Sequence, residues 1–164
     1  MQPAKYWIDN LNLQPHPEGG FYKETYRAEE ILADNLPPRF LGPRSISTAI
    51  YFLLRSADKS LFHRIKSDEL WHFHAGDTLN IYVLSHLSLI THRLGSNLAE
   101  GDVLQVTIPA NYWFGATVSE KGSYTLSSCT VAPGFDFEDF ELADQATLLQ
   151  DFPMHAEIIM RLTR

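Results

Sequence analysis

The chain has 164 residues, 45% of them hydrophobic and 20% charged, which is typical of a globular protein and argues against global disorder. A formal net charge of −7, with no cluster of Lys and Arg, disfavours contact with a phosphate backbone, so we expect no nucleic-acid partner. No apolar stretch reaches the roughly 18 residues that span a bilayer, so we expect no membrane partner.

The amino-terminal residues predict a helix and a turn. "PAKYWIDNLNL" predicts a short amphipathic helix, with Pro3 near its start and Trp7, Ile8 and Leu11 on one face. "QPHPEGG" is typical of a turn, because it holds two prolines and a glycine pair that permits positive φ. The same amino terminus lacks the basic region and apolar stretch of a signal peptide.

The next segment predicts one strand and then a long excursion. "FYKETYR" alternates, which predicts a strand with Tyr22, Glu24 and Tyr26 on one face. Residues 28–45 contain three prolines and predict irregular structure. We expect residues 1–44 to form an arm outside the barrel proper.

From Ser47 onward the chain predicts a series of short strands. Each segment is rich in β-branched or aromatic residues and is bounded by Gly, Asp, Ser, Pro or Asn. The segments are 47–54, 60–65, 69–75, 77–85, 87–94, 102–109, 112–119 and 123–131. Such spacing without intervening helices predicts an antiparallel sandwich or barrel. We expect a single domain over 1–164, with its barrel core at about 45–133.

The carboxy-terminal residues change to a helical pattern. "ELADQATLLQDFP" and "MHAEIIMRLTR" carry apolar residues at helical spacing, including Leu142 and Leu149 in the first and Ile158 and Leu162 in the second. We therefore expect a helical segment at about 139–164.

The stretch "FHRIKSDELWHFHAG" at 62–76 concentrates histidines and carboxylates. Successive side chains of a strand point to opposite faces, so Glu69 shares a face with Trp71 and Phe73, whereas His72 and His74 lie on the other. We expect His72 and His74 to line an outer sheet face or a subunit contact.

Two other residues of this stretch form the candidate site. "RIKSD" predicts a turn that brings His63 and Glu69 onto facing strands. A carboxylate beside an imidazole can orient the ring and raise its basicity, whether the ring takes a proton or a metal. Strand parity sends Arg64 away from His63.

The spacing His63-x5-Glu69-x6-Gly76 resembles the first conserved motif of the cupin superfamily. "GDVLQVTIPANYWF" resembles the second motif through its Gly-Asp and Pro109. "PHPEGGFYKETYR", "TAIYFLL", "FHRIKSDELWHFHAGD" and "TVAPGFDFEDFELA" resemble an uncharacterised single-domain cupin family (Cupin_5-like) across nearly the whole chain. The resemblance implies a mostly β fold, a double-stranded β-helix or jelly-roll barrel, with a short amino-terminal helix and carboxy-terminal helices.

The cupin metal ligands are only partly present. His63 and Glu69 occupy ligand positions of the first motif, but its second histidine falls on Ile65 and the histidine of the second motif falls on Phe114. Because transition metals usually take three or four protein ligands, we expect no tightly bound metal cofactor. Any weakly bound divalent ion would lie at His63 and Glu69.

Aromatic residues are expected beside this pair. Trp71 and Phe73 share the face of Glu69, and Trp113 or Phe114 lies where the missing histidine would be. These four residues are candidates for binding a small, partly apolar or ring-shaped ligand. The alternative for each is an ordinary place in the core.

Three further groups have more than one interpretation. In "PHPEGG", His16 and Glu18 lie at a barrel mouth or a dimer interface, or belong to an ordinary turn. "PGFDFEDFE" predicts a solvated acidic edge in preference to a calcium site, since it lacks an EF-hand spacing. The single cysteine, Cys129, cannot form an intramolecular disulfide, so we expect a buried thiol and a cytoplasmic protein.

Three functions fit these residues. The resemblance extends to sugar-nucleotide epimerases, metal-free cupins in which a barrel histidine paired with a carboxylate abstracts a proton from carbon. It implies a metal-independent isomerase or epimerase with His63 as base and Glu69 as its orienting partner or a second acid–base group. The alternatives are a non-catalytic ligand-binding protein and a weakly metal-dependent oxygenase or hydrolase. The superfamily also implies a homodimer, with "FYKETYR" as an exchanged or packed edge strand.

An enolate in such a reaction requires a stabilising group. The candidates that the sequence offers, without a ranking among them, are Tyr22, Tyr26, Tyr51, Tyr82 and Arg44.

Overall fold

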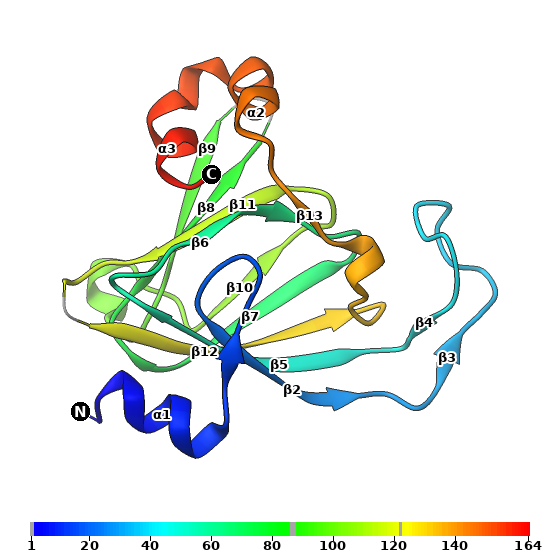
Figure 1. Cartoon of the computed structure of the whole chain (residues 1–164), viewed down its shortest axis with the longest axis horizontal. Helices are drawn as coiled ribbons and strands as arrows, with labels where there is room; N and C mark the ends of the chain where they lie inside the picture. The colour runs from blue at the N-terminus through cyan, green and yellow to red at the C-terminus, as the bar shows by residue number, and fades with distance from the viewer. Residues whose placement is uncertain (1, 86–87, 122) are drawn as a thin grey trace.

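The computed structural model of the chain describes residues 2–85, 88–121 and 123–164. Two antiparallel sheets face one another, and short helices lie outside them (Figure 1). In chain order the elements are α1 (Ala4–Leu11), β1 (Gln14–Pro15), β2 (Phe21–Arg27), β3 (Ile31–Leu32), β4 (Arg44–Ser45), β5 (Thr48–Arg55), β6 (Ser60–Arg64), β7 (Asp68–Gly76), β8 (Leu79–Leu84), β9 (Leu89–Leu94), β10 (Gln105–Ile108), β11 (Trp113–Val118), β12 (Tyr124–Ala132), β13 (Glu141–Leu142), α2 (Gln145–Asp151) and α3 (Ala156–Arg161).

The two sheets are built from strands far apart in the sequence. Among the described residues, the larger sheet has six strands in the order β1-β2-β5-β12-β7-β10, and the smaller has five in the order β13-β6-β11-β8-β9. Strands β3 and β4 pair outside both sheets. The predicted mostly β jelly-roll fold is confirmed, and each predicted strand from residue 47 onward overlaps an observed one; the expected start at Leu87 lies outside the described residues.

The main core fills the space between the sheets. Alternation puts Phe52 and Leu54 of β5, Trp71 of β7, Ile81 of β8 and Phe114 of β11 on inner faces, where each is at most 1% exposed. These β-branched and aromatic side chains suit the pleated, buried surface of a strand. The enclosed core leaves one end of the barrel for a cavity.

Helix α1 covers the outside of the larger sheet. Pro3 precedes the helix as its N-cap residue, and Trp7, Ile8 and Leu11 pack onto Leu53, as the apolar spacing predicts. The arm that continues from α1 enters the larger sheet, where β2 pairs with β5 of the same chain.

Helices α2 and α3 cover the outside of the smaller sheet. Leu148, Ile159 and Leu162 pack there against Phe62 and Trp113. The predicted helix at 141–153 begins later than expected, because 141–142 form β13 and the Asp144 side chain caps α2 by accepting from Thr147 N. None of the helices in the described ranges is long and apolar enough to cross a membrane.

A bulge in β2 decides which of its side chains turn inward. Glu24 pairs with Ile50 and Tyr26 with the adjacent Ala49, so Thr25 is the extra residue on β2. The bulge shifts the alternation by one position. Arg27 therefore turns toward the cavity, and the expectation that Tyr26 shares the face of Tyr22 and Glu24 is wrong: Tyr26 is 55% exposed.

Candidate functional site

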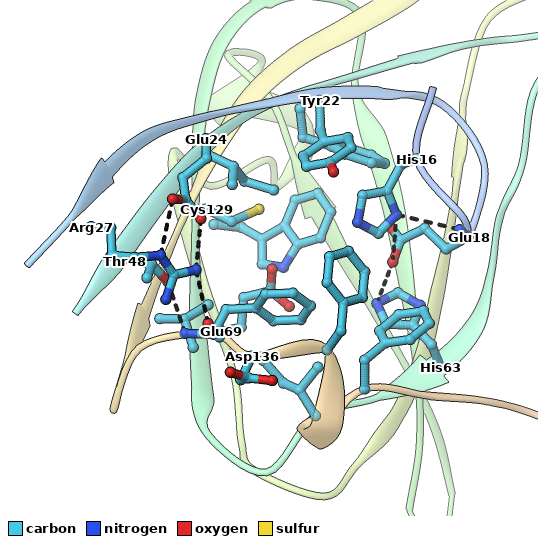
Figure 2. Close-up of a pocket in the computed structure, with 18 of the residues that line it drawn as sticks. His16, Glu18, Tyr22, Glu24, Arg27, Thr48, His63, Glu69, Cys129 and Asp136 are labelled. Atoms are coloured by element: carbon cyan, nitrogen blue, oxygen red, sulfur yellow. Dashed lines mark hydrogen bonds and ion pairs between the residues drawn. The ribbon is translucent and has the colours of Figure 1, made fainter. Parts of the chain in front are cut away.

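A cavity with a volume of about 420 Å³ opens between the two sheets. Its walls come from β2, β5, β7 and β12 of the larger sheet, β6 of the smaller sheet, the loop at 16–20 and the segment 135–140 (Figure 2). The aromatic lining residues are Tyr22, Phe52, Trp71, Phe135, Phe137 and Phe140. An apolar wall with a few converging polar groups is the usual form of a small-molecule site.

The buried pair at one side of the cavity joins Glu18 and His63. The His63 Nε2 lies 2.9 Å from Glu18 Oε2, and the Ser60 hydroxyl donates to Glu18 Oε1 at 2.9 Å. His63 Nδ1 lies 2.7 Å from the Leu61 carbonyl oxygen. Because a carbonyl only accepts, Nδ1 carries a hydrogen, and the contact between Nε2 and the carboxylate contains one further proton.

Each member of the pair stabilises the charged form of the other. Burial alone would lower the pKa of His63, but the charge and hydrogen bond of Glu18 raise it above its usual value. Burial alone would raise the pKa of Glu18, but the charge of His63 and hydrogen bonds from His63 and Ser60 lower it. The shared proton therefore resides on the imidazole.

The glycine pair of "PHPEGG" places Glu18 in the barrel. Gly19 and Gly20 have φ values of 113° and 75°, a region that side chains disfavour. A Cβ on Gly19 would lie only 2.0 Å from the Lys59 carbonyl oxygen, so the loop packs directly on the backbone before β6. Leu61 N donates to the Glu18 carbonyl at 2.9 Å, which fixes the loop beside His63.

His16 adds a neutral imidazole to the same side. Its Nδ1 accepts from the Glu18 backbone N–H at 3.3 Å, which leaves the ring proton on Nε2. Burial lowers the pKa of His16, and the positive charge of His63 lowers it further against the effect of Glu18. Rings of Tyr22 and Phe140 contact it edge-on, so His16 offers a donor within an aromatic wall.

Glu69 lies on the opposite sheet and has a perturbed pKa. It is 7% exposed on β7, whereas His63 is on β6 of the smaller sheet. Burial raises the pKa of Glu69 to about 7; the charge of His63 opposes this and the charge of Glu18 adds to it. A carboxyl group near pH 7 in both protonation states is suited to carry protons.

The segment 135–140 forms part of the cavity wall. Phe135, Asp136, Phe137 and Phe140 all line it, and Asp139 is buried. The expectation of a solvated acidic edge therefore holds only for Glu138 and Glu141, whose side chains are exposed. Residues 137–139 form a 3₁₀ turn that Asp136 caps by accepting from Glu138 N.

A buried ion pair holds this segment against the barrel. Asp139 is 5% exposed and accepts from the Arg44 Nε and Nη2 at 2.7 and 2.8 Å. Burial raises the pKa of Asp139, but the hydrogen bonds and charge of Arg44 outweigh this and lower it. Arg44 thus has a positioning task here and is not among the cavity-lining residues.

The sequence matches a known family. The family described as "Cupin superfamily (DUF985)" matches residues 5–143. The chain belongs to this DUF985 family. A hypothetical protein from Leishmania major is 35% identical and superposes with a TM-score of 0.91 over 99% of each chain. Protein SO0799 from Shewanella oneidensis is 41% identical, with a TM-score of 0.88 over 100% of this chain and 99% of that one.

Two more distant proteins are also similar, one in sequence and one in structure. The uncharacterized protein YML079W of Saccharomyces cerevisiae is 27% identical over 143 residues, which cover 80% of this chain and 71% of the relative. Oxalate decarboxylase from Bacillus subtilis is 13% identical with a TM-score of 0.57, over 90% of this chain and 36% of that one. This last likeness shows the cupin fold alone.

In this DUF985 protein the two residues expected to form the site share a cavity but do not bind each other. His63 and Glu69 both line the cavity, but the carboxylate that hydrogen-bonds His63 is Glu18. The expectation that Glu69 orients His63 is therefore wrong. Glu69 keeps the alternative role of a second acid–base group. The sequence feature that could have indicated the position of Glu18 is the glycine pair after it, because glycines allow a loop to pack closely against the barrel.

Of the four aromatic candidates, only Trp71 lines the cavity. Phe73 faces the interior two residues further along β7, where it packs against the core beyond the reach of the cavity. Trp113 faces outward beneath α2 and α3, with the Arg64 guanidinium 4.3 Å from its ring centroid. Phe114 faces inward but lies behind His63, with ring centroids 4.2 Å apart, so it supports that ring and does not line the cavity.

The remaining polar candidates lie outside the cavity, with one exception. Tyr22 is a lining residue, whereas Tyr51 and Tyr82 are not. His72 and His74 lie on the outer sheet face, where they contact Thr130 and Ser128 hydroxyls, as predicted. Arg64 pairs with Glu141 away from His63, also as predicted.

The residues do not fit the metal centre that the cupin fold implies. In the part of the chain that the structure describes, no three His, Cys, Asp or Glu side chains are grouped so that they could hold a metal ion. Ile65 lines the cavity at one ligand position and Phe114 occupies another, and neither has a ligand atom. Both ring nitrogens of His63 already have hydrogen-bond partners, Leu61 O and Glu18.

Proposed function

We propose that the protein is an acid–base enzyme of the isomerase or epimerase class that moves a proton at a carbon beside a carbonyl group. The observation that supports this most directly is the buried Glu69, whose pKa of about 7 suits a proton carrier, opposite the His63–Glu18 pair. Cavity size and aromatic walls suit a small, partly apolar or ring-shaped substrate.

The two acid–base groups belong to opposing walls. Glu69 comes from β7 of the larger sheet and His63 from β6 of the smaller sheet, so a substrate between them presents one face to each (Figure 2). Epimerisation requires removal of a proton from one face and its return to the other. This arrangement favours that reaction over one that requires a single base.

The proton steps follow from these positions. The Glu69 carboxylate takes the proton, the C–H electron pair forms a carbon–carbon double bond, and the carbonyl electrons move to oxygen as an enolate. The double bond then takes a proton from the His63–Glu18 pair on the opposite face, and the oxygen becomes a carbonyl again.

Deuterium incorporation tests this proposal. Unphosphorylated and phosphorylated ketoses, aldoses and lactones are incubated with enzyme in D₂O, and mass spectrometry measures deuterium at carbon. We expect incorporation into at least one compound, with a loss of about 10²–10⁴-fold for Glu69→Gln, since a positioned base contributes that much. The matched control is Glu24→Gln, a second carboxylate of the cavity wall. No incorporation across the panel, or equal rates for Glu69→Gln, contradicts the proposal.

A non-catalytic binding protein is the second candidate. It is favoured by the mutual pairing of His63 and Glu18, which leaves no ring nitrogen of His63 without a hydrogen-bond partner. In that case ligand affinity survives Glu69→Gln, and no deuterium enters any ligand that binds. Truncation of Trp71 weakens the affinity, because its ring forms part of the wall.

A further inference from the structure

Trp71 carries a buried hydrogen-bond donor that the fold does not use. Its side chain is 1% exposed and lines the cavity, and among the described residues its indole Nε1–H has no hydrogen-bond partner. An unpartnered buried donor is costly, and most such groups in native proteins are paired. A ligand that accepts from this N–H would remove that cost.

The indole and the Glu69 carboxyl form a neighbouring pair on one strand. The two residues are two positions apart and both point to the inner face of β7. The indole lowers the pKa of Glu69, although its N–H does not reach hydrogen-bond geometry with the carboxylate. A ligand beside both groups can place an acceptor at the indole N–H and a C–H group at the carboxylate. A carbonyl compound offers both, because its oxygen accepts and the carbon next to the carbonyl carbon carries the removable hydrogen.

The charges of the wall limit what else the ligand can carry. Arg27 is neutralised by Glu24, which accepts from Nε and Nη2 at 3.0 and 2.7 Å, and Arg27 also donates to the Phe135 carbonyl at 3.1 Å. His63 is neutralised by Glu18. Asp136 and Glu69 add negative charge, so no cation of the described wall is left to pair with a phosphate.

We infer that the site takes an unphosphorylated, uncharged carbonyl compound whose carbonyl oxygen accepts a hydrogen bond from Trp71 Nε1. The carbon beside the carbonyl group then lies at Glu69, and this part of the inference rests on the proposed function. During proton removal negative charge grows on the same oxygen, so the hydrogen bond strengthens as the enolate forms. Ligand binding and the preference for uncharged ligands require no turnover, so they are measured separately from deuterium incorporation.

Nuclear magnetic resonance of the indole groups tests the hydrogen bond directly. The chain has three tryptophans, so ¹⁵N-labelled protein gives three indole signals, which Trp→Phe variants assign. The probes are fructose, xylulose and gluconolactone, each beside its phosphate monoester. We expect the Trp71 signal to move saturably with an unphosphorylated probe, and its phosphate ester to bind at least about tenfold more weakly.

Two variants separate the donor from general packing. Trp71→Phe keeps an aromatic ring and removes the N–H, and we expect about tenfold weaker binding of the same probe. Trp113→Phe makes the same change outside the cavity and leaves the affinity unchanged. The Trp7 indole, which donates to the Tyr124 hydroxyl at 2.8 Å, reports by its unchanged signal that each variant is folded.

The outcomes distinguish this inference from the proposed function. Equal affinities of Trp71→Phe and Trp113→Phe, equal binding of phosphate esters, or no saturable shift with any unphosphorylated probe overturns the inference. The wild-type titration remains decisive if Trp71→Phe does not fold. Binding that depends on Trp71 without deuterium incorporation keeps the inference and removes the enzyme. Deuterium incorporation that is the same in Trp71→Phe as in the wild type keeps the enzyme and overturns the inference.

Discussion

Glu18 accepts a hydrogen bond from His63 across 2.9 Å, although Glu18 lies in the loop before β2 and His63 on β6. Both residues are buried, with 4% and 3% of their surface exposed. Burial of either charge alone would carry a large desolvation cost, and the attraction between the two charges offsets it. The amino-terminal arm is thereby part of the site, even though it precedes the barrel in the sequence.

Replacing Glu18 tests the origin of the charge on His63. In Glu18→Gln the carboxylate is lost, burial dominates, and we expect the pKa of His63 to fall below 6.5, whereas the wild-type value lies above it. The imidazole is then neutral at pH values where the wild-type ring is charged. Nitrogen chemical shifts of the histidine rings, measured through a pH titration, give both values.

Glu24→Gln serves as the matched control for Glu18→Gln. Glu24 also lines the cavity, but it pairs with Arg27 and makes no hydrogen bond to His63. We expect the His63 titration to be unchanged in this control. A His63 ring that stays protonated to the same pH in Glu18→Gln contradicts the ion pair.

The approach of the Glu18 loop to the barrel predicts a strong effect of Gly19→Ala. The new Cβ would overlap the Lys59 carbonyl oxygen, so the loop must move and the contact with His63 is broken. We expect a loss of at least about 2 kcal/mol in the free energy of unfolding, measured with denaturant, because backbone overlap adds to the strain of positive φ.

Gly101→Ala is the control for backbone strain alone. Gly101 has a φ of 86°, but nothing lies within 4 Å of the position that its Cβ would occupy. We expect this variant to lose only about 1 kcal/mol, since the left-handed conformation is its one cost. If both variants lose the same free energy, the close packing of Gly19 is not what fixes the loop.

Local sequence patterns predicted the barrel well because each strand alternates and ends at a turn residue. Parity placed Glu69 and Trp71 inward and His72 outward, since β7 pairs with β12 in regular register from Asp68 to Phe73. His74 also lies on the outer face, although the register shifts between Phe73 and Ala75. It failed at Tyr26, because a bulge at Thr25 has no marker in the alternation.

The partner of His63 was beyond any local pattern. The loop "PHPEGG" is a turn, as its prolines and glycines indicate, but where a turn packs depends on contacts with distant segments. Glu18 reaches His63 because Leu61 N binds the Glu18 carbonyl and because Gly19 has no side chain. The Phe135–Phe140 segment is similar: the pairing of Asp139 with Arg44 pulls it onto the barrel.

The homodimer implied by the superfamily stays a prediction. The side chains of Leu98, Val103 and Leu104, which precede the edge strand β10, are 63%, 43% and 51% exposed. Burying such apolar surface between two copies is favourable. We expect sedimentation velocity to give twice the 18.7 kDa mass of the chain, and a mass that stays at one chain at every concentration contradicts the dimer.

The raised pKa of Glu69 predicts a stability that falls as pH rises. The folded pKa is about 7, against an ordinary value of 4.5, so between these values the unfolded chain ionises while the folded one stays protonated. Burial of Glu69 therefore does not lower the free energy of unfolding below about pH 4.5, and it lowers it by the full amount above about pH 7. Glu69→Gln is neutral throughout and escapes this penalty.

Denaturant unfolding at several pH values measures the difference between the two proteins. From about pH 5 to pH 8 we expect the wild type to lose roughly 2–3 kcal/mol of unfolding free energy relative to Glu69→Gln. Glu157→Gln makes the same change at an exposed position of α3, and its stability should follow that of the wild type at every pH. If the gap between wild type and Glu69→Gln does not widen with pH, Glu69 ionises in the folded protein at an ordinary pH and loses its suitability as a proton carrier near neutrality.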